Sequence, residues 1–239
     1  NLYIVTYKIY PSGVVNVNAK FTSTDMQAAE TEVSEATRMA TFTPGSDAAR
    51  KAASKLEVPR IGVRFRLPAQ MNNVQYFGRG PEENYTDRNH GTVVGVYKTT
   101  ADKMYFNYVR PQENGHRTDT RWIALSPDKG KGLVIVADSL VGFNALRNSI
   151  EDFDSEEALP HPYQWSNFTP EEVANHNEKA ARNVLRRMHH VNDITPRDFV
   201  EVCVDMKQQG VGGYDSWGSR PEPIYQIPAN REYNWGFTL

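Results

Sequence analysis

Alternation of apolar and polar residues at every second position is the feature that most limits what this chain can fold into. In residues 14–21, for example, Val15, Val17 and Phe21 would face one side of an extended chain, and Asn16 and Lys20 the other. This period of two belongs to the β-strand, in which successive side chains point to opposite faces. We therefore expect strands with one buried face, as in antiparallel sheets.

The same alternation recurs along the chain between turns rich in Gly, Pro and Asn. Residues 3–10 and 14–21 flank Pro11-Ser12-Gly13 and predict a β-hairpin. Further strands are expected, in chain order, at residues 61–67, 74–77, 92–97, 121–126, 133–137, 199–206 and 233–239. Many strands without alternating helices predict an all-β fold, an antiparallel sandwich.

Two stretches interrupt the alternation. Residues 25–56 are rich in Ala, Glu and Thr, and residues 153–185 are similar. In the second stretch Thr169-Pro170-Glu171-Glu172 forms a capping box with proline at the first helical position, which predicts a helix over 170–181. We expect both stretches to be helical insertions, at about 25–57 and 148–185, in a single domain that covers residues 1–239.

Composition excludes several classes of protein. The net charge of -2, with basic and acidic residues interleaved, argues against a nucleic-acid partner. No apolar run reaches the roughly 20 residues that span a bilayer, so no membrane partner is expected. Cys203 is the only cysteine, which rules out a disulfide within the chain, and its position between valines predicts a small buried residue in a strand.

The first residues already have the pattern of a strand. They follow neither an initiator methionine nor a signal peptide. We therefore expect the chain to be an excised fragment of a longer protein, which leaves its compartment open.

The first of three polar clusters covers residues 78–88. Its glycines do not form a dinucleotide fingerprint, because proline follows them and no helix pattern begins there. Glu82, Asn84 and Arg88 could bind sugar hydroxyls, which need paired donors and acceptors. The alternative is a tight turn, held by a pair between Asp87 and Arg88 and by bonds from Asn84 to the backbone.

The second cluster covers residues 110–117. Glu113 could act as a general acid or base, whereas Asn114-Gly115 is a turn signal that would place Glu113 at a strand end. Glycoside hydrolysis needs two carboxylates, about 5–5.5 Å apart for retention or roughly 6.5–9.5 Å for inversion. No such pair is evident nearby, so we expect Glu113, Asn114 and Arg117 to be sugar-facing or structural and not catalytic.

The third cluster, residues 210–219, surrounds Trp217 with glycines. An indole on such a loop can serve as a platform for the apolar face of a sugar, and Tyr214, Asp215 and Ser216 are candidate neighbours in the same site. The alternative is a tryptophan that closes the rim of the core. The histidines predict no metal site: His189 and His190 would point to opposite faces of a strand, and the others lack ligand spacing.

Taken together, the three clusters resemble the C-terminal, small-chain domain of the family 2 β-galactosidases. That domain carries Gly-Pro-x-Glu-Asn-Tyr-x-Asp-Arg, then Pro-x-Glu-Asn-Gly-x-Arg, then a Gly-Gly-x-Asp-Ser-Trp loop, in this order. Here the three motifs fall at residues 80–88, 111–117 and 212–217, after a matching segment at 59–62. The resemblance runs from about residue 59 to the C-terminus, and more faintly over the first hairpin.

The resemblance implies a large antiparallel supersandwich of the galactose mutarotase type. It also implies a retaining parent enzyme whose two catalytic glutamates, and whose magnesium and sodium ligands, lie in a central (β/α)8 barrel outside this chain. No cofactor is then expected in the chain itself. Trp217 takes the position from which the family's tryptophan stacks on substrate, particularly on the glucose side of lactose.

The partners implied are a β-galactoside substrate, the barrel domain of the same polypeptide and possible further copies of the chain in a homo-oligomer. The compartment would be that of the parent enzyme, cytoplasmic or periplasmic. Residues 25–57 are longer than the family's usual connection, residues 148–162 are inserted, and Tyr214 stands where the family loop often has an acid. These departures leave the preference for the acceptor-side sugar open.

Two other functions remain alternatives. One is a stand-alone carbohydrate-binding or mutarotase-like module, for which Glu113 and His116 are the nearby acid and base. They lie three residues apart around a turn, which is poor geometry for opposite faces of a sugar ring. The other is a purely structural domain that mediates contacts in an oligomer.

Overall fold

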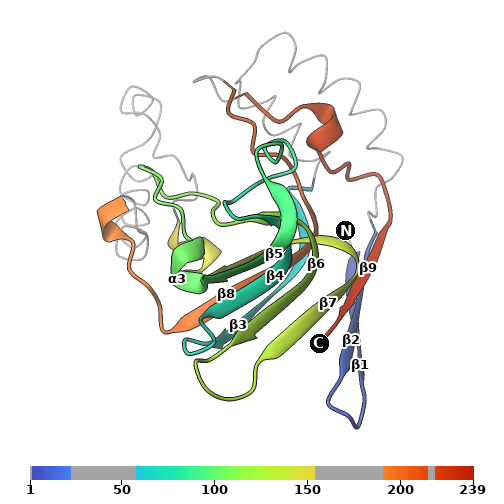
Figure 1. The fold of residues 1–239 in the computed structure, drawn as a ribbon. Helices are drawn as coiled ribbons and strands as arrows, with labels where there is room; N and C mark the ends of the chain where they lie inside the picture. The colour runs from blue at the N-terminus through green and yellow to red at the C-terminus, as the bar shows by residue number, and fades with distance from the viewer. Residues whose placement is uncertain (1, 23–57, 154–190, 215–218) are drawn as a thin grey trace, which may run out of the picture.

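The computed structural model describes residues 2–22, 58–153, 191–214 and 219–239. About half of these residues form antiparallel strands, shown in Figure 1. The strands are β1 (Leu2–Ile9), β2 (Val15–Thr22), β3 (Arg60–Pro68), β4 (Asn73–Gly80), β5 (Val93–Thr100), β6 (Arg117–Ser126), β7 (Leu133–Leu146), β8 (Phe199–Gln208) and β9 (Tyr233–Thr238). In the described part of the chain they are joined by a short helix, α3 (Ala101–Met104), and by the 3-10 turns η1 (Ile150–Asp152), η3 (Val191–Asp193) and η4 (Pro223–Tyr225). The predicted all-β class is confirmed.

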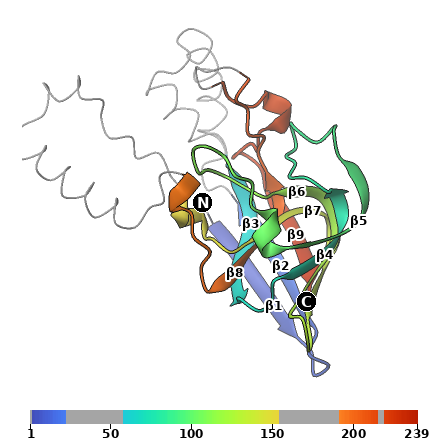
Figure 2. The ribbon, with the colours of Figure 1, turned by 60° about the vertical axis from the view of Figure 1, so that its left-hand side comes forward.

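All nine strands of the described residues belong to one sheet, in the order β1-β2-β9-β7-β6-β4-β5, with β8 on β7 and β3 on β8. The 14-residue strand β7 pairs with β9 at Val136 and Ala137, and with β8 over residues 142–146. Its register against β6 shifts between these two regions. The sheet therefore divides at β7, and Figures 1 and 2 show β1, β2 and β9 on one side and β3 and β8 on the other.

The buried face follows the sequence pattern. In β2, Val17, Ala19 and Phe21 are buried, while Asn18 and Lys20 are exposed. The hairpin predicted for residues 3–21 is confirmed, with β1 and β2 paired along their whole length. Inward-facing side chains of every strand but β1 and β5 supply buried core residues, so the core is one continuous apolar cluster.

Two strands differ most from the expected bounds. Strand β7 continues past residue 137 to Leu146, because the exposed Asp138, Ser139 and Leu140 interrupt the alternation without ending the strand. Strand β6 begins at Arg117, earlier than expected, since Thr118 and Thr120 are buried despite their hydroxyl groups. In both cases tertiary contacts, and not the local alternation of apolar and polar residues, determine the bound of the strand.

Cys203 lies in β8 and is 3% exposed, as predicted. Burial raises the pKa of its thiol to about 12. The predicted insertion at 25–57, the helix at 170–181 and most of the insertion at 148–185 lie outside the described residues. Within the described part of the chain, no helix is long and apolar enough to cross a membrane.

Candidate functional site

The buried side chain of Asn84 holds the first polar cluster together by hydrogen bonds. It is fully buried, and its side-chain nitrogen donates to the carbonyl groups of Arg79 (3.2 Å) and Glu82 (3.0 Å). Its side-chain oxygen accepts from the backbone N–H (2.9 Å) and the hydroxyl (2.6 Å) of Thr118. All of these bonds are internal, so Asn84 closes the loop on itself and fastens it to β6. Glu82, beside it, is exposed.

Glu83 joins the first cluster to the second. One carboxylate oxygen accepts from Arg88 (2.8 Å) and from the hydroxyl of Tyr108, and the other accepts from the backbone N–H of Gly115 (2.8 Å). The Arg88 guanidinium also lies 5.1 Å from the centre of the Tyr85 ring. Neither Glu83 nor Tyr108 was among the candidate residues, although the motif at 80–88 has its glutamate at Glu83 and its variable position at Glu82.

The pair expected between Asp87 and Arg88 is not formed. Tyr85 and Arg88 exchange backbone hydrogen bonds of 3.2 and 2.8 Å, so Asp87 lies at the tip of a tight turn. Arg88 binds Glu83 at the back of this turn. The Asp87 carboxylate instead faces the segment that follows β8.

Asn114 and Arg117 hold the second cluster in place. Asn114 is 1% exposed; its side chain accepts from the backbone N–H of Phe106 (2.6 Å) and donates to the carbonyl of Phe106 (2.5 Å). Arg117 is 4% exposed and donates to the hydroxyl of Tyr76 (3.2 Å) and to the carbonyl of Gly115 (3.1 Å). These polar groups are therefore engaged within the domain.

A buried charge cluster lies beneath the second motif. Arg60 donates to both oxygens of Asp205, at 2.8 and 2.7 Å, and its third nitrogen lies 3.3 Å from a Glu113 oxygen. Burial raises the pKa of Glu113, against the opposing effect of the Arg60 charge. Asp205 was missed in the sequence, although an acid among the valines of β8 was a signal. Because Asp205 is 1% exposed and engaged on Arg60, Glu113 and Asp205 do not form an open pair for glycoside hydrolysis.

His116 completes this cluster. Its ring stacks on Tyr85, with centroids 5.5 Å apart and planes at 18°, and its Nδ1 lies 3.8 Å from an Asp205 oxygen. Burial lowers the pKa of His116 well below its usual value, and the charges of Arg60 and Arg117 act in the same direction. The imidazole is 1% exposed and covered by Tyr85, so no sugar ring fits between it and Glu113.

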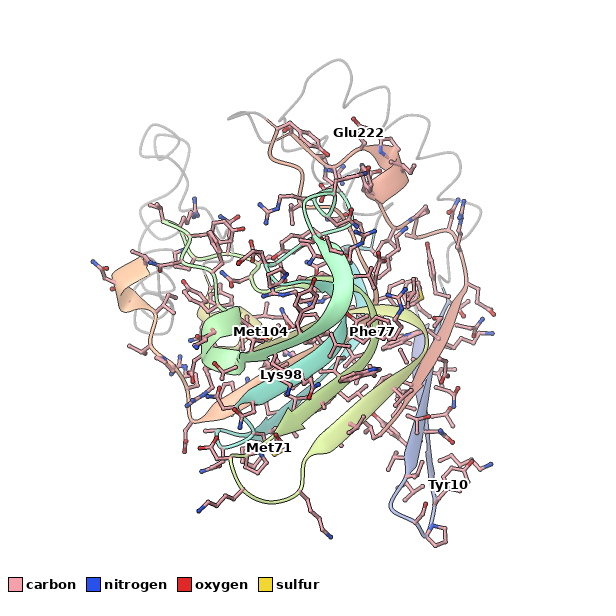
Figure 3. All side chains as sticks on the ribbon, viewed as in Figure 1. Tyr10, Met71, Phe77, Lys98, Met104 and Glu222 are labelled. Carbon is pink, nitrogen blue, oxygen red and sulfur yellow. The ribbon has the colours of Figure 1, made fainter. Side chains whose placement is uncertain are left out.

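The third cluster begins where Asp87 binds the chain after β8. The Asp87 carboxylate accepts from the backbone N–H groups of Val211 (3.1 Å) and Gly212 (2.8 Å). Tyr214, two residues on, is 60% exposed. Asp215, Ser216 and Trp217 lie outside the described residues. Three motifs far apart in the sequence thus meet at one end of the domain, and Figure 3 shows Glu222 at this end, opposite Tyr10 at the hairpin turn.

A groove of about 460 Å³ lies on the outer face of β1, β2 and β9. Thr6, Asn18, Lys20, Asp138 and Asn234 line it with polar side chains. None of the candidate sugar-binding residues that the structure describes lines this groove. It is therefore separate from the three motifs.

No group of three or more His, Cys, Asp or Glu side chains in the described part of the chain is arranged to hold a metal ion. The described residues thus form a site in two parts. Exposed side chains at the surface are available to a ligand, and the buried polar groups beneath them are hydrogen-bonded to one another. Sugar hydroxyls could reach Tyr214 and the exposed edge of the first cluster. They could not reach Asn84, Asn114 or Arg117 without displacing internal hydrogen bonds.

The sequence of this chain is similar to those of known β-galactosidases. Its sequence matches the family described as Beta galactosidase small chain over residues 2–239. The β-galactosidase of Priestia megaterium is 33% identical over 183 residues, which cover 77% of this chain and 15% of that protein. That of an Arthrobacter species is 40% identical over 124 residues, 49% of this chain and 12% of that protein. β-Galactosidase BgaC of Bifidobacterium adolescentis is 31% identical over 174 residues, 73% of this chain and 14% of that protein.

The chain therefore spans about 12–15% of the length of these relatives. The family match, by contrast, extends over almost the whole chain, including all nine strands. This chain belongs to the β-galactosidase small chain family.

Proposed function

We propose that this chain is the C-terminal accessory domain of a β-galactosidase that hydrolyses terminal β-D-galactosides such as lactose. In this proposal the domain lends the indole of Trp217 to an active site completed by a barrel domain of the same polypeptide. Tyr214, Asp215 and Ser216 are its neighbours in that site. The family membership supports the parent activity, and the exposed position of Tyr214 supports a loop that is open to a partner surface.

The observation that carries this proposal is the meeting of the three motifs. Asp87 of the first motif binds the backbone at Val211 and Gly212, at the start of the third, and Glu83 binds Gly115 of the second. A rigid base of this kind suits a loop that presents a side chain to a site formed by another domain. Among the described residues of this base, the carboxylates of Glu83, Asp87 and Asp205 are engaged by internal hydrogen bonds, which fits an accessory role.

The chemistry of the parent enzyme would be that of a retaining glycosidase. One glutamate attacks the anomeric carbon and a second protonates the leaving oxygen, then activates the water that releases the sugar. We assign both glutamates, and the implied magnesium and sodium sites, to the barrel, since the described residues here hold neither arrangement. The isolated chain should therefore be inactive. A mutarotase-like epimerase is disfavoured by the covered ring of His116.

Two measurements test this function. The purified chain should not release the chromophore from a nitrophenyl β-galactoside above the rate of a mock purification. Lactose titration, followed by tryptophan fluorescence, should show weaker binding by Trp217→Ala, by about 1–3 kcal/mol. Turnover by the chain alone would contradict the accessory role, and equal lactose affinity of both proteins would contradict the role of Trp217.

A further inference from the structure

The groove on the outer face of β1, β2 and β9 is built around a glycine. Gly236 of β9 pairs with Asn18 of β2, and a Cβ atom on it would lie 3.0 Å from Asn18 Oδ1 and 2.5 Å from Asp138 Oδ2. A side chain at this position would therefore collide with both oxygens. The volume of the groove, about 460 Å³, lies within the range of roughly 300–1,000 Å³ that is usual for small-molecule sites.

The change of neighbour along β7 brings Asp138 to this groove. Strand β7 pairs with β9 at Val136 and Ala137, and the exposed residues Asp138 and Ser139 follow directly. Both of them line the groove, together with residues of β1, β2 and β9 (Figure 1). The groove thus receives side chains from four strands, of which β1 and β7 lie on either side of the β2–β9 pair.

The polar side chains nearest the floor of the groove are unpaired. In the described part of the chain no side-chain hydrogen bond or ion pair is formed by four exposed lining residues, Thr6, Asn18, Asp138 and Ser139. Lys20 and Asn234, which also line the groove, are instead bound to Glu232 at 2.7 and 2.9 Å. The positive charge of Lys20 is therefore neutralised by Glu232, and the carboxylate of Asp138 remains the uncompensated charge of the groove.

The chemistry of these four groups selects a class of ligand. A carboxylate, a carboxamide and two hydroxyls supply both acceptors and donors, as adjacent sugar hydroxyls require. The charge of Asp138 would repel an anion, and an apolar ligand would leave the four polar groups desolvated without partners. Ile4, which is 45% exposed, lines the same groove and offers an apolar surface to the C–H groups of a sugar ring.

We propose that this groove is a second carbohydrate-binding site, which takes a neutral pyranose through the side chains of Asp138 and Asn18. The site is independent of the three motifs and of the proposed function. Hydroxyl groups of the sugar donate to the carboxylate of Asp138, and such bonds to an ionised acceptor are stronger than neutral ones. The amide of Asn18 accepts from one neighbouring hydroxyl and donates to another.

The test is a titration of the isotope-labelled chain with methyl β-D-galactopyranoside and with methyl β-D-glucopyranoside, followed by NMR. The amide signals of Thr6, Asn18 and Gly236 should shift and saturate in the millimolar range with at least one of these sugars. Asp138→Asn keeps the shape of the side chain and removes its charge, so it should weaken binding about tenfold. Asp198→Asn, a matched change at an exposed acid that does not line the groove, should bind as wild type does.

The same titration of Trp217→Ala separates the two sites. Groove signals that respond in this variant as in wild type support a site of its own, even if the proposed role of Trp217 fails. Loss of the response in Trp217→Ala would overturn the proposal, since the groove would then only sense binding elsewhere.

Three further results would overturn the second site. The first is the absence of saturable shifts with both sugars, and the second is equal affinity of wild type and Asp138→Asn. The third is a response of the groove signals to calcium chloride but to neither sugar, which would identify a cation site. Should Asp138→Asn not fold, Asn18→Ala removes the other proposed contact and should also weaken binding.

Discussion

Arg60 and Asp205 are joined by two hydrogen bonds of 2.8 and 2.7 Å, with the Asp205 side chain 1% exposed. The pair links β3 to β8, and it is the centre of the buried charges below the second motif. Breaking a buried ion pair by removing one partner leaves an uncompensated charge, which costs far more than the loss of an exposed pair. This relationship gives the first prediction.

Replacement of Arg60 by methionine should lower the free energy of unfolding by about 3–5 kcal/mol, because Asp205 remains buried without its partner. Urea denaturation measures this change. Arg66→Met is the matched control in the same strand: Arg66 is 52% exposed, and its partner Glu201 keeps a bond to Arg64. The control should cost about 1 kcal/mol or less. Equal losses in the two variants would contradict the buried character of the Arg60 pair.

The second prediction concerns pH. Since burial lowers the pKa of His116, the unfolded chain binds a proton at this residue more readily than the folded chain does. The contribution of His116 to the free energy of unfolding is therefore fully present above the pKa of histidine in the unfolded chain, about 6.5. Below that pH it decreases by about 1.4 kcal/mol for each pH unit, until the lower pKa of His116 in the folded chain is reached. Glu113 acts in the opposite sense in acid, because burial raises its pKa.

A comparison with His116→Gln separates these effects. Unfolding should be measured at several pH values between about 5 and 7.5, and the difference between wild type and variant should shrink as the pH falls. His90→Gln, at an exposed residue, is the control for the loss of a histidine at the surface. A difference that is constant across this range would show that His116 is as easily protonated in the folded chain as in the unfolded chain.

The third prediction concerns Gly115, which has a φ angle of 71°. A Cβ atom there would lie 2.8 Å from Leu146 Cδ2 and 2.9 Å from the carbonyl oxygen of Met104, at the end of α3 (Figure 3). Gly115→Ala should therefore destabilise the domain by about 2–3 kcal/mol, from backbone strain and overpacking together. Gly13→Ala, with a φ angle of 89° and open space around the added atom, should cost about 1 kcal/mol from strain alone. Thermal unfolding of the two variants measures the contribution of packing.

The fourth prediction is that the thiol of Cys203 is inert in the folded domain. Burial raises its pKa to about 12, and the thiolate is the reactive form. At pH 8 a disulfide reagent such as Ellman's reagent should not modify the native chain over the time in which the chain unfolded in guanidinium reacts completely. Rapid modification of the native chain would place Cys203 at an accessible surface.

The sequence was informative about strands wherever burial alternates regularly. Residues 15–21 and the strand β4, in which every second residue is buried, follow the period of two. Strand β7 does not, because Asp138, Ser139 and Leu140 lie where the strand changes its neighbour from β9 to β8. Which strand pairs with β7 at each point depends on the tertiary structure, and the local sequence pattern does not predict it.

The polar clusters were recognisable as motifs, but their mutual contacts were not. Asn84 reads equally well as a sugar ligand or as a buried turn residue, and only its bonds to Thr118 show how it is used here. The contact of Asp87 with Val211 and Gly212 spans too many residues for spacing to predict it. Family resemblance, by contrast, correctly identified the family to which the chain belongs, because the order of three motifs is more specific than any one of them.

The pairing of strand β7 also affects how the domain unfolds. Its first half supplies a neighbour to β9 and its second half a neighbour to β8, while β6 pairs with both halves. Neither side of the sheet can lose this strand without exposing the backbone of the other. We therefore expect the described sheet to melt cooperatively, as a single unit with one transition, and its two sides to share a common stability against heat and denaturant.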